Sequence, residues 1–335
     1  MKRVANFFIL SVLILGTMVS CSNRKGVTLP PCTGRPGELI LVLADDFYKG
    51  AIGDSLVRIL TQDEPSLPQT GMEGAEPMFD LIHIPPTAFG NMIRPARNLI
   101  LTEIGPHITK AEIIAAKDYW AADQYLMRLH APDKESFMQL IEENREIIVN
   151  TFREGEVDRQ AAFNRRYQNV PLATQLSSKH QIDIAFPKGF EARIDTGNFI
   201  WVQYDPQDII QGVLIWSTPY TDESQLEYNR LVTSIDQYMK PRVPGPATGS
   251  YMALELDYPI STRAFTLDSV YVRELKGLWE TEGAFMGGPF VSWTLVDEKR
   301  DRLVTTFGFV YAPRTNKRNH IRKVESILKT IRFPD

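Results

Sequence analysis

Two adjacent carboxylates, Asp45 and Asp46, follow the apolar run of residues 39–44. The carboxyl end of such a strand is where α/β enzymes often carry acids or metal ligands, so these two with the distant His83 are candidates for a hydrolytic site. Adjacent residues of a strand point to opposite faces, however, so the two carboxylates need not converge. We therefore favour turn and helix-start roles for both aspartates.

Other catalytic motifs do not stand out. The histidines are scattered, and none has the HExxH or HxH spacing of a metal site. No serine has the G-x-S-x-G context of a nucleophile elbow. Gly50-x-x-Gly53 precedes Asp54-Ser55 without the Lys-Ser/Thr of a phosphate-binding loop. The sequence therefore predicts no catalytic residue, metal or cofactor, although a site assembled from distant segments stays open. The histidines are His83, His107, His130, His180 and His320.

The first residues have the pattern of an export signal. Lys2 and Arg3 are followed by a nearly apolar run over residues 4–19, about 24 Å long as a helix and short for a hydrocarbon core of about 30 Å. The run ends in Met18-Val19-Ser20-Cys21, which resembles the lipobox of bacterial lipoproteins, with Met18 in place of the usual Leu. The resemblance implies that residues 1–20 are removed and that Cys21 is acylated, with chains such as palmitate. An ordinary signal peptide is the alternative.

Acyl chains on Cys21 would hold a soluble body on a membrane, since each buried CH₂ contributes about 0.8 kcal/mol. The next residues contain no Asp beside the cysteine and no acidic run. By resemblance to lipoprotein sorting rules, this favours the periplasmic face of the outer membrane. Residues 21–36 are rich in Pro and Gly and are predicted to be a tether.

Two stretches are candidates for binding. Residues 279–293 carry aromatic and glycine residues that could form a mobile contact loop, or else a hairpin connection packed on the core. The start of the last helix carries a basic cluster that could face anionic head groups or a polysaccharide, or else solvent. The candidate binding residues are Trp279, Phe285, Met286, Phe290, Trp293, Arg314, Lys317 and Arg318.

Asp54-Ser55-Leu56 and Asp268-Ser269-Val270 resemble the short Asp-Ser/Thr-aliphatic motif for O-glycosylation of exported Bacteroidetes proteins. Ser55 and Ser269 are therefore candidate O-glycosylation sites. Motifs of three residues also arise by chance.

Composition limits the class of partner. Removing residues 1–20 takes two basic and no acidic residues from 37 Lys plus Arg and 41 Asp plus Glu, which leaves a net charge of about −6. Nucleic acid is therefore not an expected partner. Cys21 and Cys32 are the two cysteines, so a thioether at Cys21 would leave Cys32 without a disulfide partner in the chain.

The apolar run of residues 38–44 predicts a central strand covered on both faces, and residues 52–60 a helix capped by Asp54 or Ser55. Further strands are expected at 79–84, 98–104 and 181–186. A hairpin, a Pro and a helix then occur three times, around Pro132, Pro219 and Pro313, with helices expected at 134–152, 224–239 and 316–330. Whether these units are a true internal repeat stays open.

These elements predict an α+β fold of antiparallel sheets with helices packed on them, in two sandwich-like domains. The expected division is an N-terminal α+β domain over residues 37–155, a surface linker helix over 156–175 and a C-terminal α+β domain over 176–335.

The second half resembles the α/β/α sandwich shared by the photosystem protein PsbP, the Ran-binding protein Mog and several bacterial lipoproteins. The matching features are Pro187-Lys188-Gly189-Phe190, the paired strands and the final helix over residues 326–333. The mature chain is also similar to a family of uncharacterised Bacteroidetes lipoproteins with a domain of unknown function, through residues 37–53, 76–80 and 97–100. That family implies a compartment but no activity.

We therefore expect a non-catalytic binding or accessory protein of the cell envelope, anchored through Cys21, with an envelope protein or a glycan as partner. The alternatives are an envelope hydrolase using distant residues such as Asp45, Asp46 and His83, and a structural subunit of an outer-membrane complex.

Overall fold

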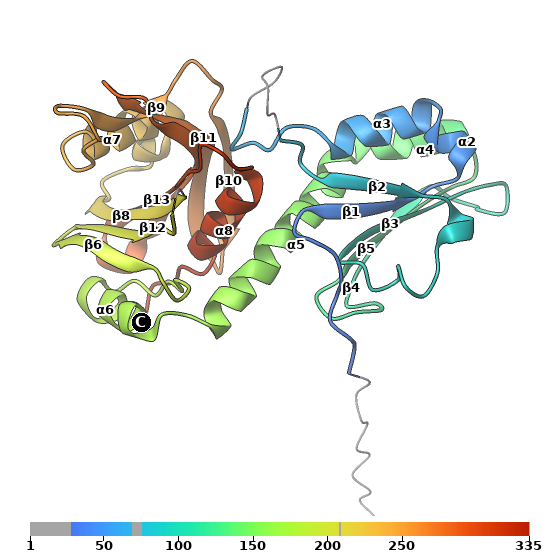
Figure 1. Cartoon of the computed structure of the whole chain (residues 1–335), viewed down its shortest axis with the longest axis horizontal. Coiled ribbons are helices and arrows are strands. Elements are labelled where there is room, and N and C mark those ends of the chain that lie inside the picture. Colours follow the sequence, from blue (N-terminus) through green and yellow to red (C-terminus); the bar gives the residue numbers. More distant parts are fainter. Residues whose placement is uncertain (1–27, 69–75, 208, 335) are drawn as a thin grey trace, which may run out of the picture.

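The computed structural model of the chain describes residues 28–68, 76–207 and 209–334. Cys21 and the expected signal peptide lie outside the described residues. The described strands form two sheets (Figure 1), one of five strands in the order β2-β1-β3-β5-β4 and one of eight strands. The α+β class expected from the sequence is confirmed. Among the described residues no helix is both long and apolar enough to cross a membrane.

The five-stranded sheet is mostly parallel. β1 (Glu38–Val42) lies between β2 (Asp80–Ile84) and β3 (Asn98–Ile104), and β5 (Tyr125–Ala131) follows β3, all parallel. Only β4 (Glu112–Lys117) is antiparallel, in the predicted hairpin with β5. The expectation of antiparallel pairing is therefore wrong for this sheet. The reason is the crossover after β1, where α2 (Asp45–Tyr48) and α3 (Ala51–Leu60) return the chain to the end from which β1 started.

Helices cover one face of this sheet. α3, α4 (Lys134–Glu143) and the first part of α5 (Arg145–Arg166) pack on β1, β3 and β5, and side chains such as Leu41, Met127 and Phe137 are fully buried between them. The helix predicted over residues 134–152 is two helices that meet at Asn144. α5 continues without a break to Arg166, so the expected boundary at residue 155 falls inside a helix.

The eight-stranded sheet is antiparallel throughout. Its path is β10 (Ser261–Leu267), β11 (Val270–Glu282), β12 (Gly287–Asp297), β13 (Arg302–Tyr311), β8 (Ile210–Pro219), β7 (Phe199–Tyr204) and β6 (Glu191–Thr196), and β9 (Tyr251–Glu255) also pairs with β11. Four of these strands, β6, β9, β10 and β11, are outside the sequence-based prediction.

Helices cover both faces of the second sheet. One core lies under α6 (Val170–His180) and α8 (Arg318–Leu328), and the other under α7 (Tyr228–Met239). The strand predicted at residues 181–186 buries Ile182, Ile184 and Phe186 with period two, but its pairing is a bridge between Asp183 and Arg332. Alternation alone therefore predicted burial correctly and sheet membership wrongly.

The two sheets meet through helices. α5 runs between them, with α8 of the second half beside it (Figure 1). The part of α5 expected to be a surface linker buries Glu156, Val157, Ala161 and Asn164. α5 thus packs on both halves and forms part of the contact between them.

Candidate functional site

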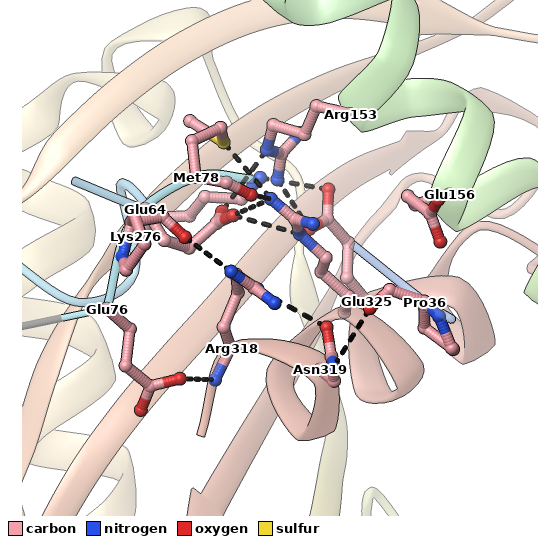
Figure 2. A network of polar contacts seen from close by, with 12 residues as sticks. Pro36, Glu64, Glu76, Met78, Arg153, Glu156, Lys276, Arg318, Asn319 and Glu325 are labelled. Atoms are coloured by element: carbon pink, nitrogen blue, oxygen red, sulfur yellow. Dashed lines mark hydrogen bonds and ion pairs between the residues drawn. The ribbon is translucent and has the colours of Figure 1, made fainter. Parts of the chain in front are cut away.

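A network of buried charges joins α5, α8 and the strand β11. Arg153 of α5 pairs with Glu325 of α8 (Nη2 to Oε2, 2.5 Å) and with Glu64 (Nε to Oε1, 3.2 Å). Lys276 of β11 reaches the other oxygen of Glu325 at 2.9 Å, and Arg322 reaches Glu64 at 2.6 Å. Figure 2 shows Glu64, Arg153, Lys276 and Glu325 converging from distant parts of the sequence.

Nearby cations lower the pKa values of the two buried glutamates, Glu64 and Glu325. Burial alone would raise the pKa of Glu64, but Arg322 and Arg153 outweigh it and lower that pKa. Burial opposes ionisation of Glu325 as well, and Arg153 with Lys276 lowers its pKa. Such carboxylates keep their charge near neutral pH, whereas a general acid or base titrates near its working pH. These properties fit a structural role, in which the network joins Glu64 and Arg153 of the first half to residues of the second half.

A second set of contacts joins the start of α8 to the N-terminal half. The Glu76 carboxylate accepts the backbone N–H groups of Lys317 (2.5 Å) and Arg318 (2.8 Å), as a negative group at a helix N-terminus does. The Arg318 guanidinium donates to Asp80 at 2.6 Å and to the carbonyl of Pro77 at 2.7 Å. Figure 2 shows Glu76 beside Arg318.

The residues of the basic cluster predicted at the start of the last helix differ in burial. Arg318 is buried and paired with Asp80, so its assignment as a binding residue is wrong. The local cost of a cation at a helix N-terminus is offset here by Glu76 and Asp80, which the sequence places far away. Arg314 is exposed and Lys317 is half-buried, and both remain candidates for binding.

A cleft of about 260 Å³ opens beside the charge network. Glu154 and Val157 of α5 line one side, and Arg263, Phe265 and Trp293 of the sheet line another. Arg263 bridges the cleft to Glu274 (2.6 Å) and Glu154 (3.2 Å). The indole N–H of Trp293 donates to Glu274 at 2.7 Å. Trp293, a candidate binding residue, is therefore a buried part of the cleft wall.

The candidate aromatic stretch of residues 279–293 is the end of a hairpin. Trp279 lies in β11, Phe290 and Trp293 lie in β12, and all three are buried. The Trp279 indole N–H donates to the carbonyl of Val310 at 3.2 Å. For these three residues the core alternative was the correct one. Phe285, at the turn between the strands, is fully exposed.

The hairpin turn borders a surface hollow of about 560 Å³. Met286, Tyr311 and Pro313 line it together with the turn itself. Glu280 and Glu282 lie at its edge and also line a neighbouring groove of about 410 Å³. Burial and the nearby Glu255 and Glu282 raise the pKa of Glu280. The turn therefore presents an apolar tip beside crowded carboxylates.

Glycines in this hairpin serve close packing. A Cβ on Gly288 would lie 2.1 Å from the carbonyl oxygen of Val310. Gly283 has a φ of +80° in the turn, a conformation that side chains rarely adopt. Of the two alternatives for this stretch, the structure shows the hairpin connection, with Phe285 in a tight turn between two long strands.

The residues of the alternative hydrolytic site partly converge. Asp45 lies 4.0 Å from His83 (Oδ1 to Nε2). That Nε2 is 2.8 Å from the carbonyl of Leu43, and the imidazole ring stacks on Tyr48 at 3.6 Å between centroids. Asp45 and Asp46 form the first turn of α2, as the turn and helix-start interpretation expects. The Nε2 of His83 is thus engaged with the backbone.

The two candidate glycosylation sites differ in access. Ser55 is buried in α3 and its hydroxyl bonds to Glu142, so a glycan cannot be attached there, and neither Ser55 nor Asp54 caps the helix. Ser269 is exposed in the turn between β10 and β11.

Within the part of the chain that the structure describes, no group of three or more His, Cys, Asp or Glu residues could hold a metal ion.

Sequence reasoning missed the charge network. A signal was available in α8, where Arg322 and Glu325 share the buried face with Ile321 and Leu328. Charged residues at the apolar positions of a helix indicate buried partners. The identity of those partners, Glu64, Arg153 and Lys276, follows only from the tertiary structure.

Comparisons with known proteins give families without assigned function. Residues 169–330 match a family described as a domain of unknown function, DUF4837, and residues 32–165 match another, DUF8532. This confirms the expected similarity to uncharacterised domains. The lipoprotein status and the Bacteroidetes origin stay predictions. No curated protein matches the chain.

Solved structures give weak similarities. A mutant of the protein Mog1 is 11% identical with a TM-score of 0.31, covering 46% of this chain and 92% of its own. LpqN, a Mycobacterium tuberculosis protein involved in cell envelope biogenesis, is 15% identical with a TM-score of 0.26, covering 46% and 83%.

Proposed function

We propose that this protein is a non-catalytic binding protein of the cell envelope, held at the periplasmic face of the outer membrane through acylated Cys21. It takes a protein partner at the turn between β11 and β12. The observation that carries the proposal is Phe285, a fully exposed aromatic side chain at the end of two long paired strands.

The anchor rests on the sequence of residues 1–21, whose basic start, apolar run and Met18-Val19-Ser20-Cys21 ending favour export and acylation.

The tip has the features of a protein-binding site. An aromatic side chain contributes a large apolar area with few rotatable bonds, and such residues dominate the energy of protein interfaces. The hollow beside Phe285 offers Met286 and Tyr311 as further contact surface. Glu280, whose pKa is raised by burial and neighbouring acids, would be stabilised by a cation from the partner. The partner surface therefore combines an apolar pocket with Lys or Arg side chains.

The experiment places a photo-crosslinking phenylalanine analogue at position 285 in the full chain in living cells. We expect one discrete protein adduct on irradiation. The matched control carries the same analogue at Tyr271, which is also an exposed aromatic residue but lies in β11. The absence of an adduct at position 285, or the same adducts from both positions, would rule out this site.

Charge complementarity is tested separately. Glu280→Gln with Glu282→Gln should weaken capture of that partner, while Glu223→Gln, an exposed acid elsewhere on the same half, should leave capture unchanged. The competing hydrolase hypothesis predicts instead that Asp45→Ala, Asp46→Ala and His83→Ala abolish an activity on envelope polymers.

A further inference from the structure

Among the described residues, α-helices cover one face of the five-stranded sheet and none packs on the other. On the other face Val42, Leu99 and Leu126 are buried, and partly buried apolar side chains such as Ile40 and Trp120 pack against them. None of the residues of this second cluster lies in an α-helix. Ile82 and Ile114, on the flanking strands, are 41% and 42% exposed. Parallel sheets usually have both faces covered, so we expect a surface outside the described residues to cover this face.

One end of this face carries aromatic side chains and cations. Trp120 contacts the ring of Phe89 (5.8 Å between centroids) and the ring of Tyr119 (4.6 Å). The guanidinium of Arg94 lies 5.6 Å from the Trp120 ring, and that of Arg128 lies 5.1 Å from the Tyr119 ring. We name this end the tether-side surface: Phe89, Met92, Arg94, Tyr119, Trp120 and Arg128.

Met92 is the most exposed apolar residue of the tether-side surface. It is 93% exposed, in a turn where the carbonyl of Gly90 accepts the N–H groups of Ile93 and Arg94. Phe89 and Arg94, before and after this turn, both contact Trp120. Aromatic rings with a polar edge, beside cations and an exposed apolar tip, are typical of protein surfaces that lie at the membrane–water boundary.

The N-terminal segment joins the body at this same end. The Ala122 N–H donates to the carbonyl of Pro30 (2.8 Å), and the Thr33 N–H donates to the carbonyl of Pro95 (2.8 Å). Residues 30–33 therefore lie against the turn after Trp120 and the segment after Arg94 (Figure 1). This part of the expected tether is bound to the body.

The remaining length from Cys21 is short. Nine Cα–Cα steps separate Cys21 from Pro30, and they span at most about 32 Å when fully extended. A globular unit of about 100 residues has a radius of gyration of about 13 Å and is thus about 34 Å across. An anchor at Cys21 would therefore keep this end of the sheet nearest the membrane.

We propose that the tether-side surface docks on the lipid surface, with Met92 and Tyr119 in the interfacial region and Arg94 and Arg128 toward lipid phosphates. This inference rests on the acylation of Cys21 proposed above. Asp118, whose carboxylate accepts the Asp123 N–H, lies in the same turn as Tyr119, so the contact depends on apolar and aromatic groups more than on net charge. Docking would orient the Phe285 tip with respect to the membrane.

The test couples the mature chain, with Cys32→Ser, through the Cys21 thiol to a maleimide lipid in vesicles of phosphatidylethanolamine and phosphatidylglycerol. The same chain blocked at Cys21 and free in solution is the reference. Hydrogen–deuterium exchange is measured by mass spectrometry. We expect several-fold slower exchange on the vesicles in residues 89–95 and 118–122. Residues 266–270, in a turn of the other half, should be unchanged.

Two variants make the result specific. Met92→Asp with Tyr119→Asp should remove the slowing, and Ile147→Asp, at an exposed apolar position of α5, should keep it. Equal exchange on vesicles and in solution, or slowing that persists in the double variant, would overturn the proposal. Because the coupling is chemical, this result does not depend on acylation in the cell, which the fractionation of Cys21→Ser tests separately.

Discussion

Arg153 of α5 and Glu325 of α8 are 172 residues apart in the sequence and form an ion pair of 2.5 Å in which each side chain is 3% exposed. Taking two charges out of water costs several kcal/mol per ion, and their attraction repays this only with good geometry and further partners. Glu64 and Lys276 supply those partners. The pair therefore fixes one particular arrangement of the two halves.

Removing one member of this network should destabilise the whole chain. Glu325→Gln removes the nearest carboxylate of both Arg153 and Lys276, which keep the longer contacts to Glu64 (3.2 Å) and Glu274 (3.3 Å), and should lower the free energy of unfolding by about 3–5 kcal/mol. Lys323→Gln, at an exposed position of the same helix, should change it by less than about 0.5 kcal/mol. Urea unfolding of the mature chain measures both. Equal effects of the two changes would contradict a stabilising role for the pair.

Stability should fall in acid because of the same network. Glu64 and Glu325 would titrate near 4.5 in the unfolded chain, and their pKa values in the folded chain are lower. Below pH 4.5 the unfolded state therefore binds more protons, so the free energy of unfolding decreases by up to about 2.7 kcal/mol per pH unit. Above that pH the contribution is fully present. Unfolding curves at several pH values should show a smaller dependence on pH below 4.5 in Glu325→Gln, because one of these carboxylates is absent.

Truncation of Trp279 and of Phe285, both in the aromatic stretch of residues 279–293, should have different effects on stability. Trp279→Ala removes a buried indole and should cost about 3–5 kcal/mol of stability. Phe285→Ala removes a side chain in solvent and should change stability by less than about 0.5 kcal/mol while abolishing partner capture. Thermal unfolding, and affinity capture of the crosslinked partner by the chain without the analogue, together separate these outcomes. A large loss of stability in Phe285→Ala would argue that its ring packs in the fold.

Substituting the acylation site should block processing or release the protein from the membrane. In Cys21→Ser, fractionation of cells should find the chain uncleaved or in a soluble fraction, because the acyl chains are the expected membrane attachment. Cys32→Ser should leave membrane attachment unchanged. A fully processed, membrane-bound Cys21→Ser protein would mean that another element holds it there.

Glycan attachment should follow exposure. If the Asp-Ser-aliphatic motif is used, Ser269→Ala should reduce the mass of the exported protein by one glycan, since Ser269 is exposed in a turn. Ser55→Ala should leave the glycan mass unchanged because that hydroxyl is buried against Glu142. Intact mass spectrometry reads both. A glycan lost only from Ser55→Ala would contradict the packing of α3.

Some elements followed from local pattern alone. The apolar run of β1, the amphipathic α3 and the three hairpin, Pro and helix segments were all predictable, because strand and helix periodicity and the turn chemistry of Pro act over a few residues. Two of the missed strands, β10 and β11, carry charged residues such as Arg263, Glu274 and Lys276, which interrupt the apolar pattern. Those charges are tolerated in the sheet because partners from other elements neutralise them.

The sequence by itself determined the export and acylation signal as a prediction, the α+β class and the positions of most local elements, since each depends on neighbouring residues. The tertiary structure decided the parallel pairing of the first sheet, the burial of Trp279, Trp293 and Arg318, and the exposure of Phe285. It also joined Glu64, Arg153, Lys276 and Glu325. The physical reason is that burial and ion pairing depend on which surfaces meet. Contacts between residues 49 to 172 positions apart produce no local periodicity in the sequence.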